Sequence, residues 1–292
     1  MTAVACSGSD GGTDDSRPTV VVTTSILGTL VTEVVGGSAE VRVLIPNGVD
    51  PHSWEPSAAD IERLQQADLL VVNGLGLEES LEESIDARRG SGRLVFDASS
   101  AVDVIASEPH EPEEGDGHDD DHGPSGDPHY WMDPVQMRGV ATELVAFLER
   151  VGLDASEAVS VLSERLNTVD ASIAERVGDL PGDRRVLVTG HDSMAYFARR
   201  YDFTVVGAVI PSRSSLAEST AGDIAELRER IADAGVTVVF TEVGTPGDVV
   251  DALASDAGVR VVEINPVSVP DDADYVEFID GIADTVVDAL AS

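Results

Sequence analysis

The chain has 292 residues, of which 18 are basic and 55 acidic, and its formal charge is -37. All the basic residues are Arg, which excludes a P-loop with its lysine and a Schiff-base lysine. The acidic surface repels phosphate and attracts cations, so we expect no nucleic-acid partner.

Residues 1–17 are small and polar, and we interpret them as a flexible tether. The single cysteine, Cys6, excludes an internal disulfide. Its setting, TAVAC, is similar to the end of a bacterial lipoprotein signal, although the expected basic and apolar regions upstream are missing. Either the start has been trimmed or Cys6 is an incidental thiol. No apolar run approaches the roughly 20 residues that a membrane-spanning helix needs.

Short β-branched runs alternate with helical patterns in both halves of the chain. The runs are TVVVTT at 19–24, VRVLIP at 41–46, DLLVVNG at 68–74, RLVFD at 93–97, RRVLVTG at 184–190, FTVVGAVI at 203–210, GVTVVFTE at 235–242 and GVRVVEIN at 258–265. Among the helical patterns, SAADIERLQQA opens with Ser57 as N-cap and Asp60 three residues on. Strands that alternate with helices predict an α/β fold with parallel sheets.

A long helix is predicted over residues 154–178. Apolar residues recur there at steps of three or four, at Leu162, Leu166, Val169, Ile173 and Val177. Asp154 with Glu157 three residues on predicts its N-terminus, and Gly178 followed by Pro181 predicts its end. We expect this helix to act as a rigid backbone.

The helix divides the chain into an N-terminal α/β lobe, residues 18–153, and a C-terminal α/β lobe, residues 179–292. We expect each lobe to contain a small parallel sheet flanked by helices, and its own core. Residues 107–126 lack periodicity and are dense in Pro, Gly, acidic residues and His, which predicts a mobile loop. This loop contains His110, His118 and His122.

Three further histidines lie in predicted loops: His52 follows the run at 41–46 by a short turn, His129 precedes a predicted helix start, and His191 follows the run at 184–190. The pentapeptide DPHSW around His52 is nearly repeated as DPHYW around His129, and the two copies use both Trp residues of the chain. His191 directly follows a predicted strand, at the sheet edge where α/β proteins bind ligands. A helix N-terminus nearby disfavours imidazolium, so we expect a neutral ring that can donate a lone pair to a metal. The spacing of the three residues matches no local metal motif.

Three blocks resemble the signature blocks of the metal-binding receptors of bacterial zinc and manganese ABC importers. They are NGVDPHSWEPSAADIERLQQADLLVVNGLGLEE, DPHYWMDP and GHDSMAYFARRY. The resemblance covers nearly the whole chain after residue 18, in order, and includes the acidic His loop. It implies two α/β lobes joined by a long backbone helix, with one metal ion between them ligated by His52, His129 and His191. It also implies that each DPH turn presents one imidazole, while Trp54 and Trp131 pack the loops.

The donor set indicates which metal is bound. Three neutral imidazoles suit Zn²⁺, whereas Mn²⁺ prefers more oxygen, and the manganese members of the family tend to have a carboxylate at the third position. Many members have an Asp where this chain has Asn265, and an amide is a poor zinc ligand, so the fourth ligand is water or a carboxylate from elsewhere. Glu242 is the candidate acid nearby, favoured as a partner that orients a ligand over a ligand itself.

The leading hypothesis is an extracytoplasmic, high-affinity zinc receptor, periplasmic or at the cell surface, and not an enzyme. It would be lipid-anchored through Cys6, act as a monomer and deliver Zn²⁺ to an ABC permease with a separate ATPase subunit. The loop histidines are either part of an acidic insertion or a low-affinity zinc collector. Two alternatives stay open: a manganese or iron receptor of the same fold, and a zinc hydrolase with an open fourth position. Against the hydrolase, no acid is visibly placed as a general base.

Overall fold

A computed structural model of the chain describes residues 17–106, 126–270 and 272–292. Cys6 and the loop histidines His110, His118 and His122 lie outside the described residues. The strands are β1 (Thr19–Val22), β2 (Glu40–Val43), β3 (Leu69–Val72), β4 (Val95–Asp97), β5 (Val186–His191), β6 (Thr204–Ile210), β7 (Val238–Thr241) and β8 (Arg260–Glu263). The α-helices are α1 (Ser25–Val35), α2 (Ala58–Gln66), α3 (Glu82–Gly90), α4 (Pro134–Arg150), α5 (Ser156–Gly178), α6 (Ala195–Tyr201), α7 (Ala221–Ala234), α8 (Gly247–Ala257) and α9 (Tyr275–Ala291).

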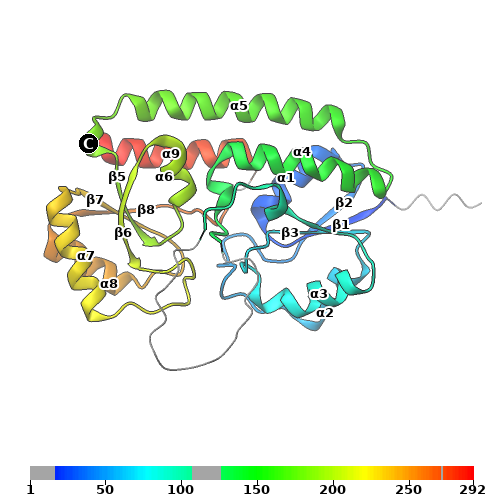
Figure 1. The fold of residues 1–292 in the computed structure, drawn as a ribbon, viewed down its shortest axis with the longest axis horizontal. Helices are drawn as coiled ribbons and strands as arrows, with labels where there is room; N and C mark the ends of the chain where they lie inside the picture. The colour runs from blue at the N-terminus through cyan, green and yellow to red at the C-terminus, as the bar shows by residue number, and fades with distance from the viewer. Residues whose placement is uncertain (1–16, 107–125, 271) are drawn as a thin grey trace, which may run out of the picture.

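The elements form two α/β lobes side by side (Figure 1). In the N-terminal lobe, four parallel strands pair in the order β2-β1-β3-β4, with Val20 opposite Val41 and Leu69. In the C-terminal lobe, β5 pairs with β6 and β7 with β8, all in parallel, and β5 lies beside β7. Each predicted run overlaps a strand, and the predicted α/β class with parallel sheets is confirmed.

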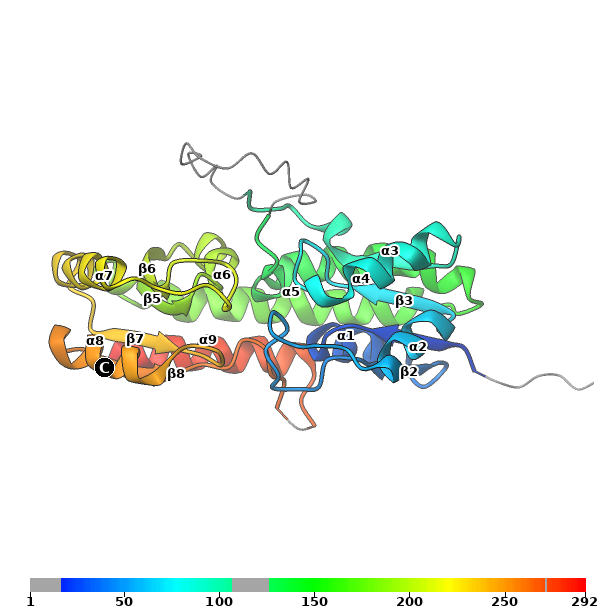
Figure 2. The same ribbon diagram turned by 90° about the horizontal axis from the view of Figure 1, so that it is seen from below.

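Helix α5 runs along both lobes (Figures 1 and 2), packing on α1 and α4 of one and on α6 and α9 of the other. It has 23 residues, or about 34 Å at 1.5 Å per residue. The residues of its predicted apolar face are all buried. Its start differs from the prediction: Ala155 precedes the first turn, and Asp154 accepts a hydrogen bond from the Ser156 N–H at 3.1 Å. The aspartate therefore closes a turn one residue before the cap.

Among the residues that the structure describes, the side chains do not form the two separate cores that we expected. The largest cluster of buried side chains is continuous through both lobes, from Leu144 on α4 through Leu166 on α5 to Phe197 and Ile279 in the C-terminal lobe. Smaller clusters lie beneath α2 and α3 and beneath α7 and α8. The core is shared because both lobes pack on α5, and a shared core opposes wide hinge motion between them.

Capping residues fix the starts of α2 and α4, the helices that follow the His52 and His129 turns. Ser57 and Asp60 form the predicted capping box at the start of α2. Asp133 caps α4, with Pro134 in its first turn. In the parts of the chain that the structure describes, no helix is long and apolar enough to cross a membrane.

Candidate metal centre

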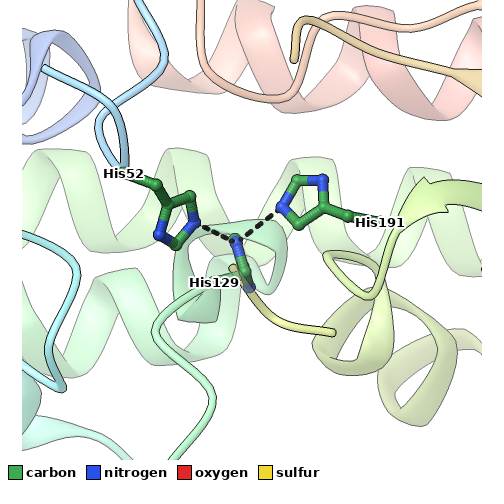
Figure 3. Close-up of side chains that lie close together, drawn as sticks. All are labelled: His52, His129 and His191. Carbon is green, nitrogen blue, oxygen red and sulfur yellow. Dashed lines mark hydrogen bonds between the residues drawn. The ribbon is translucent and has the colours of Figure 1, made fainter. Parts of the chain in front are cut away.

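His52, His129 and His191 come together between the lobes (Figure 3). The Nε2 atom of His129 lies 3.4 Å from Nε2 of His52 and 3.1 Å from Nε2 of His191. The side chains of His129 and His191 are buried, whereas His52 is half-buried. Residues far apart in the sequence therefore place three imidazole nitrogens around one point.

The repeated Asp-Pro-His sequence forms the same turn twice. Oδ1 of Asp50 accepts a hydrogen bond from the backbone N–H of His52 at 3.0 Å. Oδ1 of Asp127 accepts one from the N–H of His129 at 2.9 Å. Aspartate is suited to this because its carboxylate reaches the backbone two residues on, and the intervening Pro fixes φ. Sequence reasoning noticed the repeated His, Pro and Trp but missed the role of Asp50 and Asp127, although the repeated Asp was the available signal.

Asp127 also fixes the ring of His129, because its Oδ1 lies 2.8 Å from Nδ1 of the imidazole. Burial raises the pKa of Asp127, but the contacts with His129 and the positive charge of Arg213 outweigh burial and leave that pKa below its ordinary value. An ionised carboxylate at Nδ1 holds the ring proton there. The lone pair of His129 is therefore on Nε2, which faces the other two histidines.

His191, the last residue of β5, is held by Glu242 through its backbone N–H, and its Nδ1 lies close to the same carboxylate oxygen without being aligned for a hydrogen bond. Nδ1 and the backbone N–H of His191 both lie 2.9 Å from Oε1 of Glu242. Ser193 Oγ donates to the same buried carboxylate, at 3.1 and 3.0 Å from its two oxygens. At Gly190 an added Cβ would come within 2.9 Å of Glu242 Cγ, so glycine permits this close approach. Glu242 thus orients the imidazole from the side away from Nε2, the role that the sequence favoured.

The protonation of the cluster differs from the expectation for His191. Burial lowers the pKa of His191. The contact with Glu242 and the negative charges of Asp50 and Asp192 together raise it by more than burial lowers it, so the net pKa lies above the usual 6.5. The carboxylates thus account for the upward direction of the net shift in the pKa of His191. For His52, burial lowers the pKa to about 2, with the neighbouring His129 and His191 adding to the shift. His52 is therefore neutral at physiological pH.

The two Trp residues pack the loops that carry the histidines. The ring of Trp131 lies 5.2 Å from that of His129, and its Nε1 donates to the Pro266 carbonyl at 2.8 Å. Trp54 packs on the buried cluster beneath α2 and α3. Next to Pro266, the Oδ1 atom of Asn265 is buried and accepts no hydrogen bond from the described residues. Within that part of the chain, no carboxylate oxygen joins the three nitrogens.

The protein has two α/β lobes on one long helix, and imidazoles converge where the lobes meet. This arrangement is that of a two-lobed binding protein. The chain belongs to the ZnuA family, described as zinc-uptake complex component A, periplasmic, which matches residues 20–289. The resemblance inferred from the three sequence blocks is thereby confirmed.

Relatives of known name cover nearly the whole chain. The chain is 32% identical over 298 residues to the zinc-binding protein TroA of Treponema pallidum, covering 97% of this chain and 92% of TroA. It is 27% identical over 267 residues to the manganese-binding lipoprotein MntA of Halalkalibacterium halodurans, covering 89% and 83%. The solved structure of the periplasmic zinc-binding protein TroA from Treponema pallidum superimposes with a TM-score of 0.78 at 28% identity, over 95% of this chain and 100% of TroA. The two-lobed fold is thus that of this family.

Proposed function

We propose that this protein is an extracytoplasmic receptor that captures Zn²⁺ through His52, His129 and His191 and delivers it to the permease of an ABC importer. The carrying observation is that three imidazole nitrogens from distant parts of the chain converge, with Nε2 of His129 3.1 Å from Nε2 of His191 and 3.4 Å from Nε2 of His52. Two facing ring nitrogens need a positive charge between them, which is supplied by a proton on His191, whose pKa is raised, or by a bound metal ion that displaces this proton. Nitrogens that share a tetrahedral zinc ion are about 3.3 Å apart, given Zn–N distances of about 2.05 Å.

The donor set favours zinc over manganese. All three converging atoms are imidazole nitrogens, and nitrogen donors suit Zn²⁺ better than Mn²⁺, which prefers oxygen. TroA, the relative at 32% identity, is named as zinc-binding. MntA, at 27%, is named as manganese-binding, which keeps a manganese receptor of the same fold as the second candidate.

The family description supports the proposed partners and location. It names an uptake complex and the periplasm, which fits delivery of the ion to a permease powered by a separate ATPase subunit. MntA is named as a lipoprotein, which supports lipid anchoring through Cys6. All three histidines come from one chain, so a monomer completes the cluster. Asp127 and Glu242 hold the rings in place for capture without contributing an oxygen donor.

Titration of the metal-free protein with Zn²⁺ and with Mn²⁺ tests this function. Trp131 beside His129 provides the fluorescence signal, and analysis of bound metal gives the stoichiometry. We expect one zinc ion per chain at the cluster, bound at least about a hundredfold more tightly than manganese because of the nitrogen donors. Equal or tighter manganese binding would show that the zinc assignment is wrong.

A zinc hydrolase is the competing function of another class, because three histidines and an open position can also activate water. The family is one of uptake receptors. Glu242 contacts His191 and Ser193, so it is not placed as a general base. We expect the zinc-loaded protein to leave ester, phosphate and peptide substrates intact, and turnover of any of them would favour the hydrolase.

Zinc affinity is expected to fall with falling pH because His191 must be neutral to bind the ion. The pKa of His191 is raised in the metal-free protein, so its protonation begins above pH 6.5. Below its pKa, each pH unit lowers zinc affinity by up to about tenfold for this one proton. His52, with its pKa of about 2, adds no proton in this range. Competition with a chelator calibrated between pH 5.5 and 8 measures the profile.

The variant Glu242→Gln provides the control for this profile. It removes the carboxylate that raises the pKa of His191, so the fall in affinity should move to lower pH. At pH 8 it should also weaken zinc binding about 10- to 100-fold, the usual cost of losing a partner that orients a metal ligand. An affinity that does not change between pH 5.5 and 8 would contradict the assignment of His191 as a ligand.

A further inference from the structure

The loop between β6 and α7, residues 211–220, contacts both Asp-Pro-His turns across the junction of the lobes. In each turn one oxygen of the aspartate is used for the histidine N–H, and the other oxygen faces this loop. Oδ2 of Asp50 accepts a hydrogen bond from Ser215 Oγ at 2.5 Å. Oδ2 of Asp127 lies 3.9 Å from Nε of Arg213. The two carboxylates that position His52 and His129 therefore meet one loop of the opposite lobe.

Arg213 lies near a carboxylate of each lobe and donates to a backbone carbonyl of the N-terminal lobe. Its Nε is also 3.9 Å from Oδ2 of Asp192, which follows His191 in the C-terminal lobe. Its guanidinium donates to the carbonyl of Ala106 in the N-terminal lobe at 3.1 Å. The Asp127 side chain is fully buried, and its Oδ2 accepts no hydrogen bond from described residues. A buried carboxylate needs a compensating charge, and Arg213 supplies one from the other lobe.

The loop after β7, at Gly244, also packs against the hydrogen bond between Asp50 and Ser215. At Gly244, with φ +91°, an added Cβ would lie 2.9 Å from Oδ2 of Asp50 and 3.2 Å from Cβ of Ser215. This loop also begins next to Glu242, which holds His191. The hydrogen bond is thus packed among the elements that orient the cluster.

We propose that Arg213 and Ser215 form a clasp that holds both Asp-Pro-His turns in the zinc-bound arrangement of the lobes and slows release of the ion. This inference rests on the proposed zinc function. A bound ion joins the same two lobes, through His52 and His129 on one side and His191 on the other. The clasp and the ion therefore favour the same arrangement, and each strengthens the other. Both residues act through the aspartates and are positioning residues, not ligands.

Zinc release into excess chelator, followed by stopped-flow fluorescence, tests the clasp. We expect Arg213→Gln and Ser215→Ala each to release zinc about tenfold faster, and the double variant faster still, because losing one member of a desolvated pair acts mainly on dissociation. The association rate should change less than threefold. Arg213→Lys should recover part of the slow release because it keeps the charge. The unfolding temperature of the metal-free variants should stay within about 2 °C of the wild type.

Arg199→Gln is the matched control. Arg199 on α6 also crosses to the other lobe, where it meets Asp103 at 3.3 Å, but it contacts neither Asp-Pro-His turn. Its variant should release zinc at the wild-type rate. Wild-type release from the clasp variants, or equally fast release from Arg199→Gln, would overturn the clasp and leave the zinc site intact. A wild-type protein that binds no zinc would instead overturn the proposed function.

Discussion

Replacing His191 by alanine is expected to lower zinc affinity by at least about a hundredfold. His191 is the only member of the cluster from the C-terminal lobe, and its Nε2 lies 3.1 Å from that of His129. The change removes one of the three proposed nitrogen donors and leaves the buried Glu242 carboxylate without its imidazole. Losing a partner that only orients a ligand lowers metal affinity roughly 10- to 100-fold, so losing the ligand itself should lower it by more. Chelator competition with wild type and variant gives the ratio.

His191→Asp separates the loss of a donor from damage to the fold. It replaces a nitrogen donor by an oxygen donor, so the preference for zinc over manganese should narrow relative to the wild type. Both variants should keep the circular dichroism spectrum of the wild type in the metal-free state. Zinc affinity within threefold of the wild type for His191→Ala would show that the imidazole of His191 is not a ligand.

Local sequence patterns predicted the elements well because the signals are themselves local. The β-branched runs and the capping box of Ser57 and Asp60 specify strands and a helix start without tertiary information. The histidines could be placed in loops next to predicted strands or helices, but their convergence was implied only by the family resemblance. Spacing along the chain carries no information on which loops of two lobes meet.

The parts that were wrong or missed depend on contacts between distant segments. A nearby helix N-terminus led us to expect a neutral His191, yet burial, which lowers its pKa, is outweighed by the contact with Glu242, which follows β7, and by Asp50 and Asp192. The second oxygens of Asp50 and Asp127 and their partners Ser215 and Arg213 become visible only when the lobes are placed together. The shared core was missed for the same reason, since an apolar helix face does not reveal that two lobes pack on it.

Arg88→Met is expected to lower the free energy of unfolding by about 4 kcal/mol, the largest effect on stability that we predict. The Arg88 side chain is fully buried within the N-terminal lobe. Its guanidinium donates to the carbonyls of Leu64, Gln65, Ala67 and Leu94 at 2.8 to 3.1 Å. These carbonyls lie at the end of α2 and just before β4, so one side chain joins the two segments. Methionine fills much of the volume but removes the donors of the carbonyls of Leu64 and Ala67, whereas Gln65 keeps Arg93 and Leu94 keeps the Leu70 N–H.

The adjacent Arg89→Met is the control, since Arg89 forms ion pairs with Asp86 and Asp97 at the surface of the same helix. Its loss should cost less than about 1 kcal/mol, because exposed ion pairs contribute little. Urea denaturation of the metal-free proteins measures both changes. Zinc binds only the folded state. Free zinc at 1,000 times the wild-type Kd should therefore raise the free energy of unfolding by about 4 kcal/mol, and by the same amount in Arg88→Met if its zinc affinity is unchanged. A smaller increment for Arg88→Met would mean that the end of α2 also positions the His52 turn that precedes it.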